Sequence, residues 1–329
     1  MDEKGFGKMP MDTKRTLVFL LILIAAAAFI SPAILPHAAR GSNRRATLEQ
    51  GRYLVESVTI CFECHSERDF SKPGWPIPPG RVGSGRILWG EGSPNQGIAP
   101  NITPDAATGI GNWSDEEIVR AIKDGIGRNG KVLNPEMPSR YFHSLGDDEL
   151  HSIVLYLRSI PPVRNQLPEM AKYVPGKHPP TIAMDSIRLA KSSAMITRGA
   201  HLVRLAGCET CHTPDNEQGF IHGLEFAGGK VFRHGDQAAA SSNLTPDPSG
   251  IGYYDESLFL KVVKTGRVGA RPIFSAMPWH FYRNLTDADL KAIFAYLQAL
   301  PPVKHRVDNT EPPTHCAKCG NLHGFGNRN

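Results

Sequence analysis

The sequence predicts a mostly α-helical protein that contains two copies of one structural unit. The first observation is a series of short motifs that occurs twice in the same order, at offsets of 140–147 residues. The second is helical spacing of apolar residues in three segments of each copy. The third is composition, because 32 glycines and 27 prolines, with few alternating strand patterns, indicate short helices joined by loops.

The composition of the 329 residues also excludes several classes of protein. Hydrophobic residues make up 40% and charged residues 21%, which is typical neither of a disordered chain nor of a polytopic membrane protein. The formal net charge of +5 comes without a Lys/Arg-rich block, so we expect no nucleic-acid partner. Aromatic residues reach only 8%, and a large apolar cofactor would supply additional buried surface.

The N-terminal segment 1–40 indicates export. Residues 16–35 are uncharged and mostly apolar, and Lys14 and Arg15 precede them. A signal core has about 7–15 apolar residues, whereas a membrane-spanning helix needs about 20. The length favours an uncleaved membrane anchor, with a cleaved export signal as the alternative. As an anchor or as a signal, the segment places the rest of the chain on the periplasmic side of the inner membrane, with the basic residues that precede the apolar run on the cytoplasmic side.

The repeated motifs define the boundaries of the two copies. They are C-x-x-C-H at 61–65 and 208–212, N-[IL]-T-P-D at 101–105 and 243–247, G-I-G at 109–111 and 250–252, M-P at 137–138 and 277–278, and P-P-V at 161–163 and 301–303. Chance does not easily give this order with so little drift in the offset. We therefore predict a tandem duplication, with domain 1 at 46–165, a Pro-rich linker at 166–195, domain 2 at 196–305 and a polar tail at 306–329.

Each copy is expected to form three main helices. The first precedes the cysteine pair, at 47–58 and 196–206. The second starts at an acidic first turn, at 114–123 and 255–264. The third is stopped by a Pro-Pro pair, at 147–159 and 287–299.

The C-x-x-C-H motif is the attachment signature of c-type haem. Two thiols one helical turn apart can each add to a haem vinyl group, and the adjacent histidine then faces the iron. A zinc site would need four ligands, whereas each copy has a single cysteine pair. The sequence therefore predicts two covalently bound haem c groups, attached through Cys61, Cys64 and His65 in domain 1, and through Cys208, Cys211 and His212 in domain 2.

A c-type cytochrome also needs a sixth iron ligand, and methionine is a common one. Met137 is the only methionine between the first attachment motif and the end of domain 1, and Met277 is the only one after the second motif. Both precede proline at the same repeat position, so we predict that they are the distal ligands. The rival histidines do not occupy equivalent positions in the two copies; they are His143, His222, His234 and His280.

With these motifs, both copies resemble class I cytochrome c domains. Their order is similar to that in the cytochrome subunits of membrane-bound dehydrogenases, which pass electrons from a periplasmic dehydrogenase towards quinone or a terminal oxidase. The resemblance covers about residues 46–305. It implies two tandem class I cytochrome c domains after an N-terminal hydrophobic helix, with His65 and His212 as proximal and Met137 and Met277 as distal iron ligands. Many of those subunits carry three haems, and this chain departs from that pattern.

The departure is a third cysteine pair in the tail. Cys316 and Cys319 are followed by Gly320 rather than histidine, so the motif lacks a proximal ligand for a third haem. A disulfide or a pair of free thiols is the simplest interpretation. The alternative is a small Cys2His2 metal site completed by His315 and His323.

The sequence therefore predicts a dihaem electron carrier without catalytic residues. Its partners would be a redox protein donor and a redox protein acceptor, such as a dehydrogenase subunit, an oxidase or another cytochrome, and the membrane through residues 16–35. One alternative is a dihaem cytochrome c peroxidase, which needs an iron with an open site. Another is a sensing or structural haem module.

Overall fold

The computed structural model describes residues 47–72, 74–92, 96–168, 187–189, 191–234 and 237–326. The predicted export segment and most of the predicted linker lie outside these ranges. No helix in the described ranges is long and apolar enough to cross a membrane. Residues Thr47–Asn329 group as one compact unit, so the division into domains at 46–165 and 196–305 stays a prediction. We call 47–168 the first half and 191–326 the second half.

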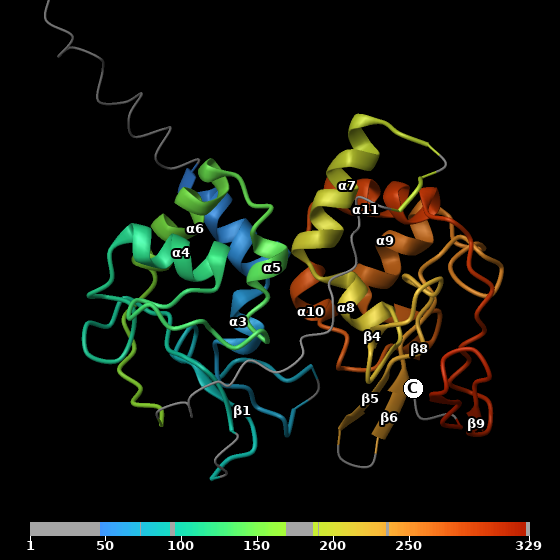
Figure 1. Ribbon diagram of the computed structural model, residues 1–329, viewed down its shortest axis with the longest axis horizontal. Helices are drawn as coiled ribbons and strands as arrows, with labels where there is room; N and C mark the ends of the chain where they lie inside the picture. The colour runs from blue at the N-terminus through green and yellow to red at the C-terminus, as the bar shows by residue number, and fades with distance from the viewer. Residues whose placement is uncertain are drawn as a thin grey trace, which may run out of the picture. The chain divides into compact units, whose positions relative to one another are not determined.

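The first half is built from short helices around long loops (Figure 1). Residues 47–53 are helical and continue into a π-helical turn. The elements that follow are η1 (Leu54–Val58), α3 (Cys61–Cys64), α4 (Asp115–Asp124), α5 (Ser139–Phe142) and α6 (Asp147–Ser159).

The second half repeats this order of helices (Figure 1). Its helices are α7 (Ala194–Leu205), α8 (Cys208–His212), α9 (Glu256–Thr265), α10 (Trp279–Tyr282) and α11 (Asp287–Ala299). The helices predicted from the sequence are confirmed, with bounds that shift by at most two residues. The mostly helical class is confirmed with them.

The described strands are short and pair only as two-stranded antiparallel sheets. The pairs are β1 (Arg86–Trp89) with β2 (Gly97–Ala99), β3 (Asp215–Asn216) with β4 (Gly219–Phe220), β5 (Val231–His234) with β6 (Gln237–Ala240), β7 (Arg267–Val268) with β8 (Arg271–Pro272), and β9 (Thr314–His315) with β10 (Leu322–His323). The sequence did not predict these hairpins, because segments of two to four residues are too short to show an alternating pattern.

The first and last helices of each half cross in close contact. A Cβ atom on Gly51 would lie 1.9 Å from the backbone oxygen of Ser152, and one on Gly199 would lie 2.0 Å from that of Ala292. Only glycine lets the two backbones approach this closely. The apolar side chains beside these crossings form the core, which includes Leu54, Val55, Leu150, Ile153, Leu202, Val203, Leu290 and Ile293.

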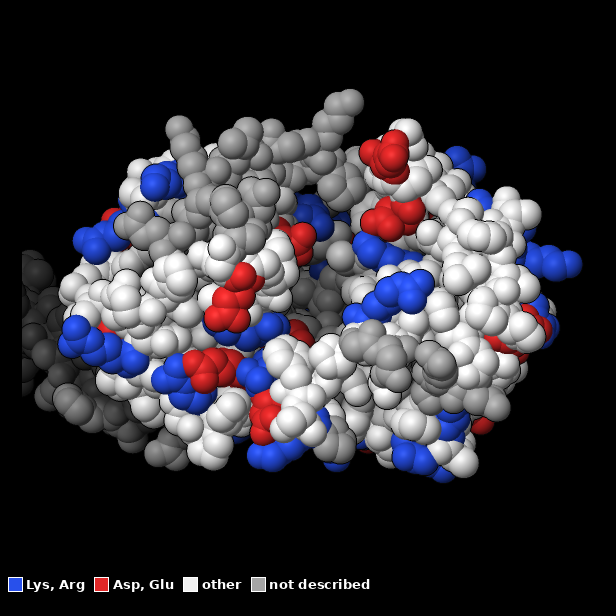
Figure 2. All heavy atoms as spheres, turned by 90° about the horizontal axis from the view of Figure 1, so that it is seen from below, with Lys and Arg blue, Asp and Glu red and all other residues white. Residues whose placement is uncertain are grey.

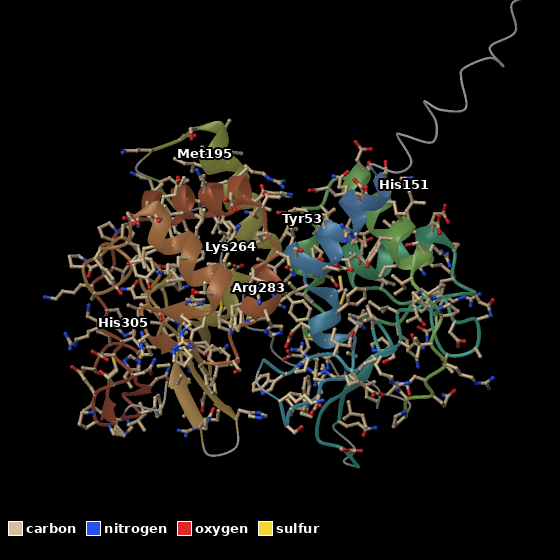
Figure 3. All side chains as sticks on the ribbon, turned by 180° about the vertical axis from the view of Figure 1, so that it is seen from behind. Tyr53, His151, Met195, Lys264, Arg283 and His305 are labelled. Carbon is tan, nitrogen blue, oxygen red and sulfur yellow. The ribbon has the colours of Figure 1, made fainter. Side chains whose placement is uncertain are left out.

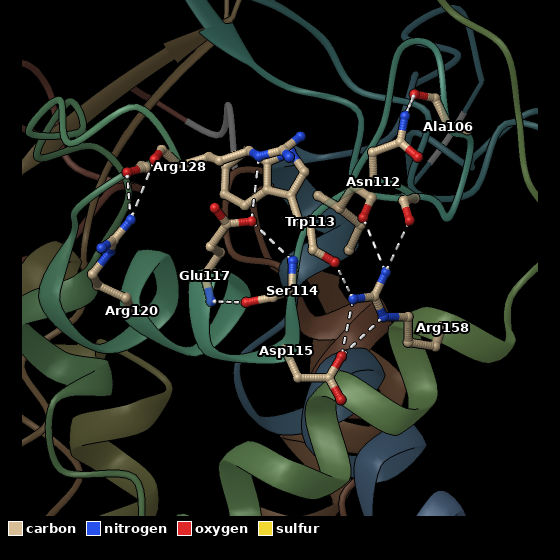
Figure 4. Close-up of polar contacts among 12 residues, drawn as sticks. Ala106, Asn112, Trp113, Ser114, Asp115, Glu117, Arg120, Arg128 and Arg158 are labelled. Atoms are coloured by element: carbon tan, nitrogen blue, oxygen red, sulfur yellow. Dashed lines mark hydrogen bonds and ion pairs between the residues drawn. The ribbon is translucent and has the colours of Figure 1, made fainter.

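The second helix of the first half has a defined start (Figure 4). Ser114 and Glu117 form a capping box, in which each side chain bonds the backbone of the other residue. Arg158 of α6 bonds Asp115 at 2.9 Å and the carbonyl of the G-I-G isoleucine at 3.1 Å. In the second half Gln298 bonds the matching isoleucine carbonyl at 3.2 Å, so both halves tie this turn to their last helix.

Charged side chains of both signs are interspersed on the face seen in Figure 2. Exposed ion pairs among the described residues include Lys291 with Glu256 at 3.0 Å and Arg306 with Glu311 at 2.5 Å. Pairs of this kind contribute about 0–1 kcal/mol each. On this face the described charges therefore do not form an extended electrostatic field of one sign.

Candidate haem sites

Each attachment motif lies on one short helical turn. The residue before each turn has a left-handed backbone, with φ of 44° at Ile60 and 62° at Gly207. This conformation is unusual for a β-branched residue such as Ile60. It bends the chain sharply from the first helix into the motif, and the helical turn then places cysteines three residues apart on one side.

The histidine of each motif is oriented by a backbone carbonyl. His65 Nδ1 lies 2.7 Å from the oxygen of Pro100, and His212 Nδ1 lies 2.8 Å from the oxygen of Ser242. A carbonyl can only accept, so Nδ1 carries the proton and Nε2 keeps its lone pair for a metal. Burial lowers the pKa of both imidazoles, which keeps them neutral.

The Asn-hydrophobic-Thr-Pro-Asp motif holds the loop that carries these carbonyls. Asn101 Oδ1 accepts from the backbone and the hydroxyl of Thr103, at 2.9 and 2.8 Å. Its amide donates to the oxygen of Val163 at 2.7 Å. In the second half Asn243 donates to Val303 at 2.8 Å, so both halves fix the loop to the P-P-V segment. The motif is thus a turn that supports the histidine from behind.

The residues beside each cysteine pair fit a haem c group. Arg86 is half-buried, its buried Nε has no hydrogen-bond partner in the described chain, and its charge acts on Cys64 and His65. In the second half, burial raises the pKa of the Cys211 thiol to about 11, and the charge of Lys230, which donates to Asp215 at 2.7 Å, opposes this shift. A cation beside each pair suits the carboxylates of a haem. The donor set of thiols and a neutral imidazole suits its covalent attachment and its iron.

The two methionines occupy turns of the same shape. The prolines that follow have φ and ψ of −81° and 45° at Pro138 and −79° and 47° at Pro278. Met137 and Met277 are half-buried and pack against the core. The equivalent backbone supports one role for both side chains, and their ligation of iron stays a prediction.

The rival histidines are engaged elsewhere. His143 and His222 each lie 3.6 Å from a carboxylate, and the side chains of both are mainly exposed. His280 Nε2 lies 2.7 Å from the guanidinium of Arg68. His234 stacks against Trp75, with ring centroids 4.4 Å apart.

The two halves contact each other's attachment helices. Helix α5 of the first half lies beside α7, next to the second attachment motif (Figure 1). There the Tyr141 hydroxyl accepts from Thr210, the third residue of that motif, at 3.0 Å. Helix α10 of the second half likewise contacts the first motif, where His280 Nε2 lies 3.4 Å from a carboxylate oxygen of Glu63. Helices α5 and α10 therefore each contact the attachment motif of the other half.

Tyr282 lies close to both attachment motifs. Its hydroxyl donates to the oxygen of Ala206 at 2.8 Å. Burial raises its pKa well above the usual value, and thiols of both pairs, including Cys208 and Cys64, raise it further. This residue could not be predicted from the sequence, because the contact depends on how the two halves pack.

Further polar contacts join the first helices of the two halves. Tyr53 faces the second half (Figure 3) and donates to Asp289 Oδ2 at 2.6 Å. Arg198 binds both oxygens of the same carboxylate, at 3.0 and 3.1 Å. Burial and this carboxylate raise the pKa of Tyr53 to about 12. A second pair, His201 with Glu149 at 3.1 Å, lies on the same boundary.

Known proteins extend this picture. No protein-family model matches the chain. It is 28% identical over 286 residues to the cytochrome c subunit of the quinone-type alcohol dehydrogenase of Gluconobacter oxydans, a match that covers 78% of this chain and 55% of the relative. The chain is related to the cytochrome c subunits of dehydrogenases. The cytochrome subunit of fructose dehydrogenase from Gluconobacter japonicus is likewise 28% identical, over 79% of this chain and 54% of that protein.

A third relative bears on the number of haems. A diheme c-type cytochrome of Cereibacter sphaeroides is 29% identical over 120 residues, which cover 35% of this chain and 36% of that protein. The relatives support covalently bound haem c in this chain. The chain spans about half the length of the first two relatives, so their activities and partners do not transfer directly.

Proposed function

We propose that this cytochrome is a dihaem electron-transfer protein that links a periplasmic dehydrogenase or another donor to the respiratory chain. The observation that carries the proposal is the paired attachment histidines, each fixed by Nδ1 to a backbone carbonyl in an equivalent loop. Two equivalent sites suit two carriers of the same kind. The relatives, which are electron-transfer subunits rather than catalytic ones, support the same function.

Each haem, when bound, would supply a reversible one-electron change at its iron. The chain would hold it through Cys61 and Cys64 in domain 1 (46–165), and through the equivalent pair in domain 2 (196–305). The fixed imidazoles and the methionine thioethers would hold the iron and exclude other ligands. The contacts of α5 and α10 with the opposite attachment motif support two sites within one packed interior.

The location and partners follow from the same proposal. The apolar run 16–35 would anchor the chain at the periplasmic side of the inner membrane, and the Pro-rich segment 166–195 would link the domains. The printed names of the relatives point to a dehydrogenase as the donor. No observation favours the peroxidase alternative, which requires the two halves to differ at the iron.

An optical redox titration of the purified holoprotein, repeated under carbon monoxide, tests the proposal. Two high-potential transitions without a carbon monoxide shift are expected, because both irons have two protein ligands. A haem that binds carbon monoxide in the native protein would contradict the carrier function and support the peroxidase.

The methionine variants assign the distal ligands. Met277→Ala should lower the potential of one haem by on the order of 0.1 V and open that iron to carbon monoxide. Met137→Ala should do the same to the other haem. If either variant leaves both irons closed, the ligand assignment of that methionine is wrong.

A further inference from the structure

The C-terminal tail folds back onto the second half. The hairpin of β9 and β10 presents the third cysteine pair at its turn, where the backbone N–H of Cys316 donates to the oxygen of Asn321 at 2.9 Å. The Asn321 side chain donates to the oxygen of Gly229 at 3.1 Å. The neighbouring residue, Gly228, donates its N–H to the oxygen of His212 at 2.7 Å. The tail is therefore fixed to the loop directly behind the second attachment motif.

Two histidines face the two thiols of this turn. His305 Nε2 lies 3.2 Å from Cys316 Sγ, and His323 Nε2 lies 3.3 Å from Cys319 Sγ. The four ligand atoms all lie within 4.8 Å of one another. With zinc–sulfur and zinc–nitrogen bonds of about 2.3 and 2.0 Å, the edges of a tetrahedral site are about 3.5 Å long. The distances between nitrogen and sulfur are close to these edges.

The surroundings orient the donors for coordination. His305 is 2% exposed, and its Nδ1 donates to the oxygen of Ala227 at 2.9 Å, which leaves the Nε2 lone pair directed at the thiol. The backbone N–H of Lys318 lies 3.4 Å from Cys316 Sγ and would stabilise a thiolate. A Cβ on Gly229 would lie 2.8 Å from Nε2 of His323, so glycine leaves the space that the imidazoles need.

We propose that the tail binds one structural zinc ion, with the ligands His305, Cys316, Cys319 and His323. Two thiolates and two neutral imidazoles are a donor set that zinc prefers, and four protein ligands leave no position for a substrate. Binding transfers one proton from each thiol to solvent and changes no oxidation state. The ion clips the tail to the second half.

This site corrects the Cys2His2 alternative drawn from the sequence in one ligand. His315 is exposed and lies outside the group, although its partner in the hairpin, Leu322, precedes the ligand His323. His305 could not be selected from the sequence, because it is the last residue of predicted domain 2 and lies eleven residues before Cys316. A signal existed, since the matching position of the first half holds Asn165 instead.

Zinc analysis of the purified full-length holoprotein tests the proposal. We expect one zinc per protein chain, and an X-ray absorption spectrum at the zinc edge with two sulfur and two nitrogen neighbours. Both cysteines should resist alkylation until a chelator is added. These readouts do not depend on electron transfer, so they stand apart from the proposed function.

Two matched histidine variants locate the ligand. His305→Asn introduces the residue that the first half has at the matching position. Loss of a group that only hydrogen-bonds a metal ligand weakens metal binding by about 10–100-fold, so loss of the ligand His305 itself should weaken zinc binding by more than that. His315→Asn should retain the ion, and the haem spectrum of each variant reports whether the protein has folded. A disulfide between the cysteines, thiols that react freely in zinc-supplemented protein, or equal zinc retention in both variants would overturn the proposal. If His305→Asn does not fold, the X-ray absorption spectrum of the wild-type protein decides whether two sulfur and two nitrogen atoms bind the zinc ion.

Discussion

The two halves agree around each attachment histidine and differ just outside it. In the first half the Asn165 side chain donates to the oxygen of Ser84 at 2.9 Å, and in the second His305 Nδ1 donates to Ala227 at the same distance. Both bonds hold the loop that follows the attachment motif. Histidine keeps the hydrogen bond that asparagine makes to the loop and adds a second ring nitrogen, Nε2, which lies 3.2 Å from Cys316 Sγ. A single exchange can thus supply a metal ligand without disturbing the frame.

The halves also differ inside the attachment motif. The second residue of the motif is Phe62 in the first half, 2% exposed, and Glu209 in the second half, fully buried. An aromatic ring there adds to the apolar core. A carboxyl group at the same place must lose its water, which costs free energy when it is ionised. The same buried position therefore accommodates an aromatic ring in the first half and a carboxyl group in the second half.

The strongest test of this equivalence removes the proximal ligands. His65→Ala and His212→Ala should each lose about half of the low-spin haem absorbance, because each leaves one iron without its proximal nitrogen. Visible and electron paramagnetic resonance spectra of the purified variants measure the loss. His143→Ala, at an exposed histidine, is the control. Loss of both low-spin signals in one variant would mean that the halves are not equivalent sites.

Much of this arrangement follows from the sequence. The attachment motifs, the main helices and the order of the repeats can all be predicted because they rest on local spacing. The Asn-Thr-Pro-Asp turn can be anticipated as a turn, since Asn and Asp bond nearby backbone. That this turn supports His65 follows only from the structure, in which the imidazole bonds the carbonyl of Pro100 directly before the turn.

Contacts between distant segments could not be predicted in this way. Tyr282 belongs to no motif, and only the packing of α10 brings it near both cysteine pairs. The repeat pattern makes His305 the last residue of domain 2, and only the fold of the tail brings it to Cys316. Spacing along the chain does not encode such pairs, because they depend on how the elements close on one another.

The helix crossings offer the next comparison, because both halves place glycine at the contact. Gly51→Ala and Gly199→Ala should each lower the free energy of unfolding by about 3 kcal/mol, since the added methyl overlaps the backbone of the partner helix. Denaturant unfolding followed by far-UV circular dichroism measures the change.

Gly146→Ala is the matched control for these variants. Its φ is −72°, and the nearest atom to an added Cβ lies 3.8 Å away. The two crossing variants should give similar losses and the control a smaller one of at most about 1 kcal/mol, because Gly146 is the N-cap of α6 and alanine is less favourable than glycine there. A loss at Gly51 without one at Gly199 would show that the second crossing adjusts where the first does not.

The smallest effect we expect concerns the buried carboxyl of the second half. Burial raises the pKa of Glu209 from 4.5 to about 7, and the charges of Arg140 and Arg204 pull it the other way. The unfolded chain ionises this group first, so the native protein loses stability as the pH rises from about 4.5 to about 7. Glu209→Gln does not titrate, and should therefore be more stable than the native protein by about 2 kcal/mol at pH 8.

The pH dependence separates this cause from better packing. The advantage of Glu209→Gln should vanish below about pH 4.5, where the native carboxyl is neutral in both the folded and the unfolded chain. Unfolding curves at pH 4 and pH 8, with the exposed Glu217→Gln as control, measure the difference. A gain that is equal at both pH values would mean that shape rather than charge separates Glu209 from Phe62. A gain confined to high pH would mean that the second half bears an electrostatic cost that the first half avoids with an aromatic ring.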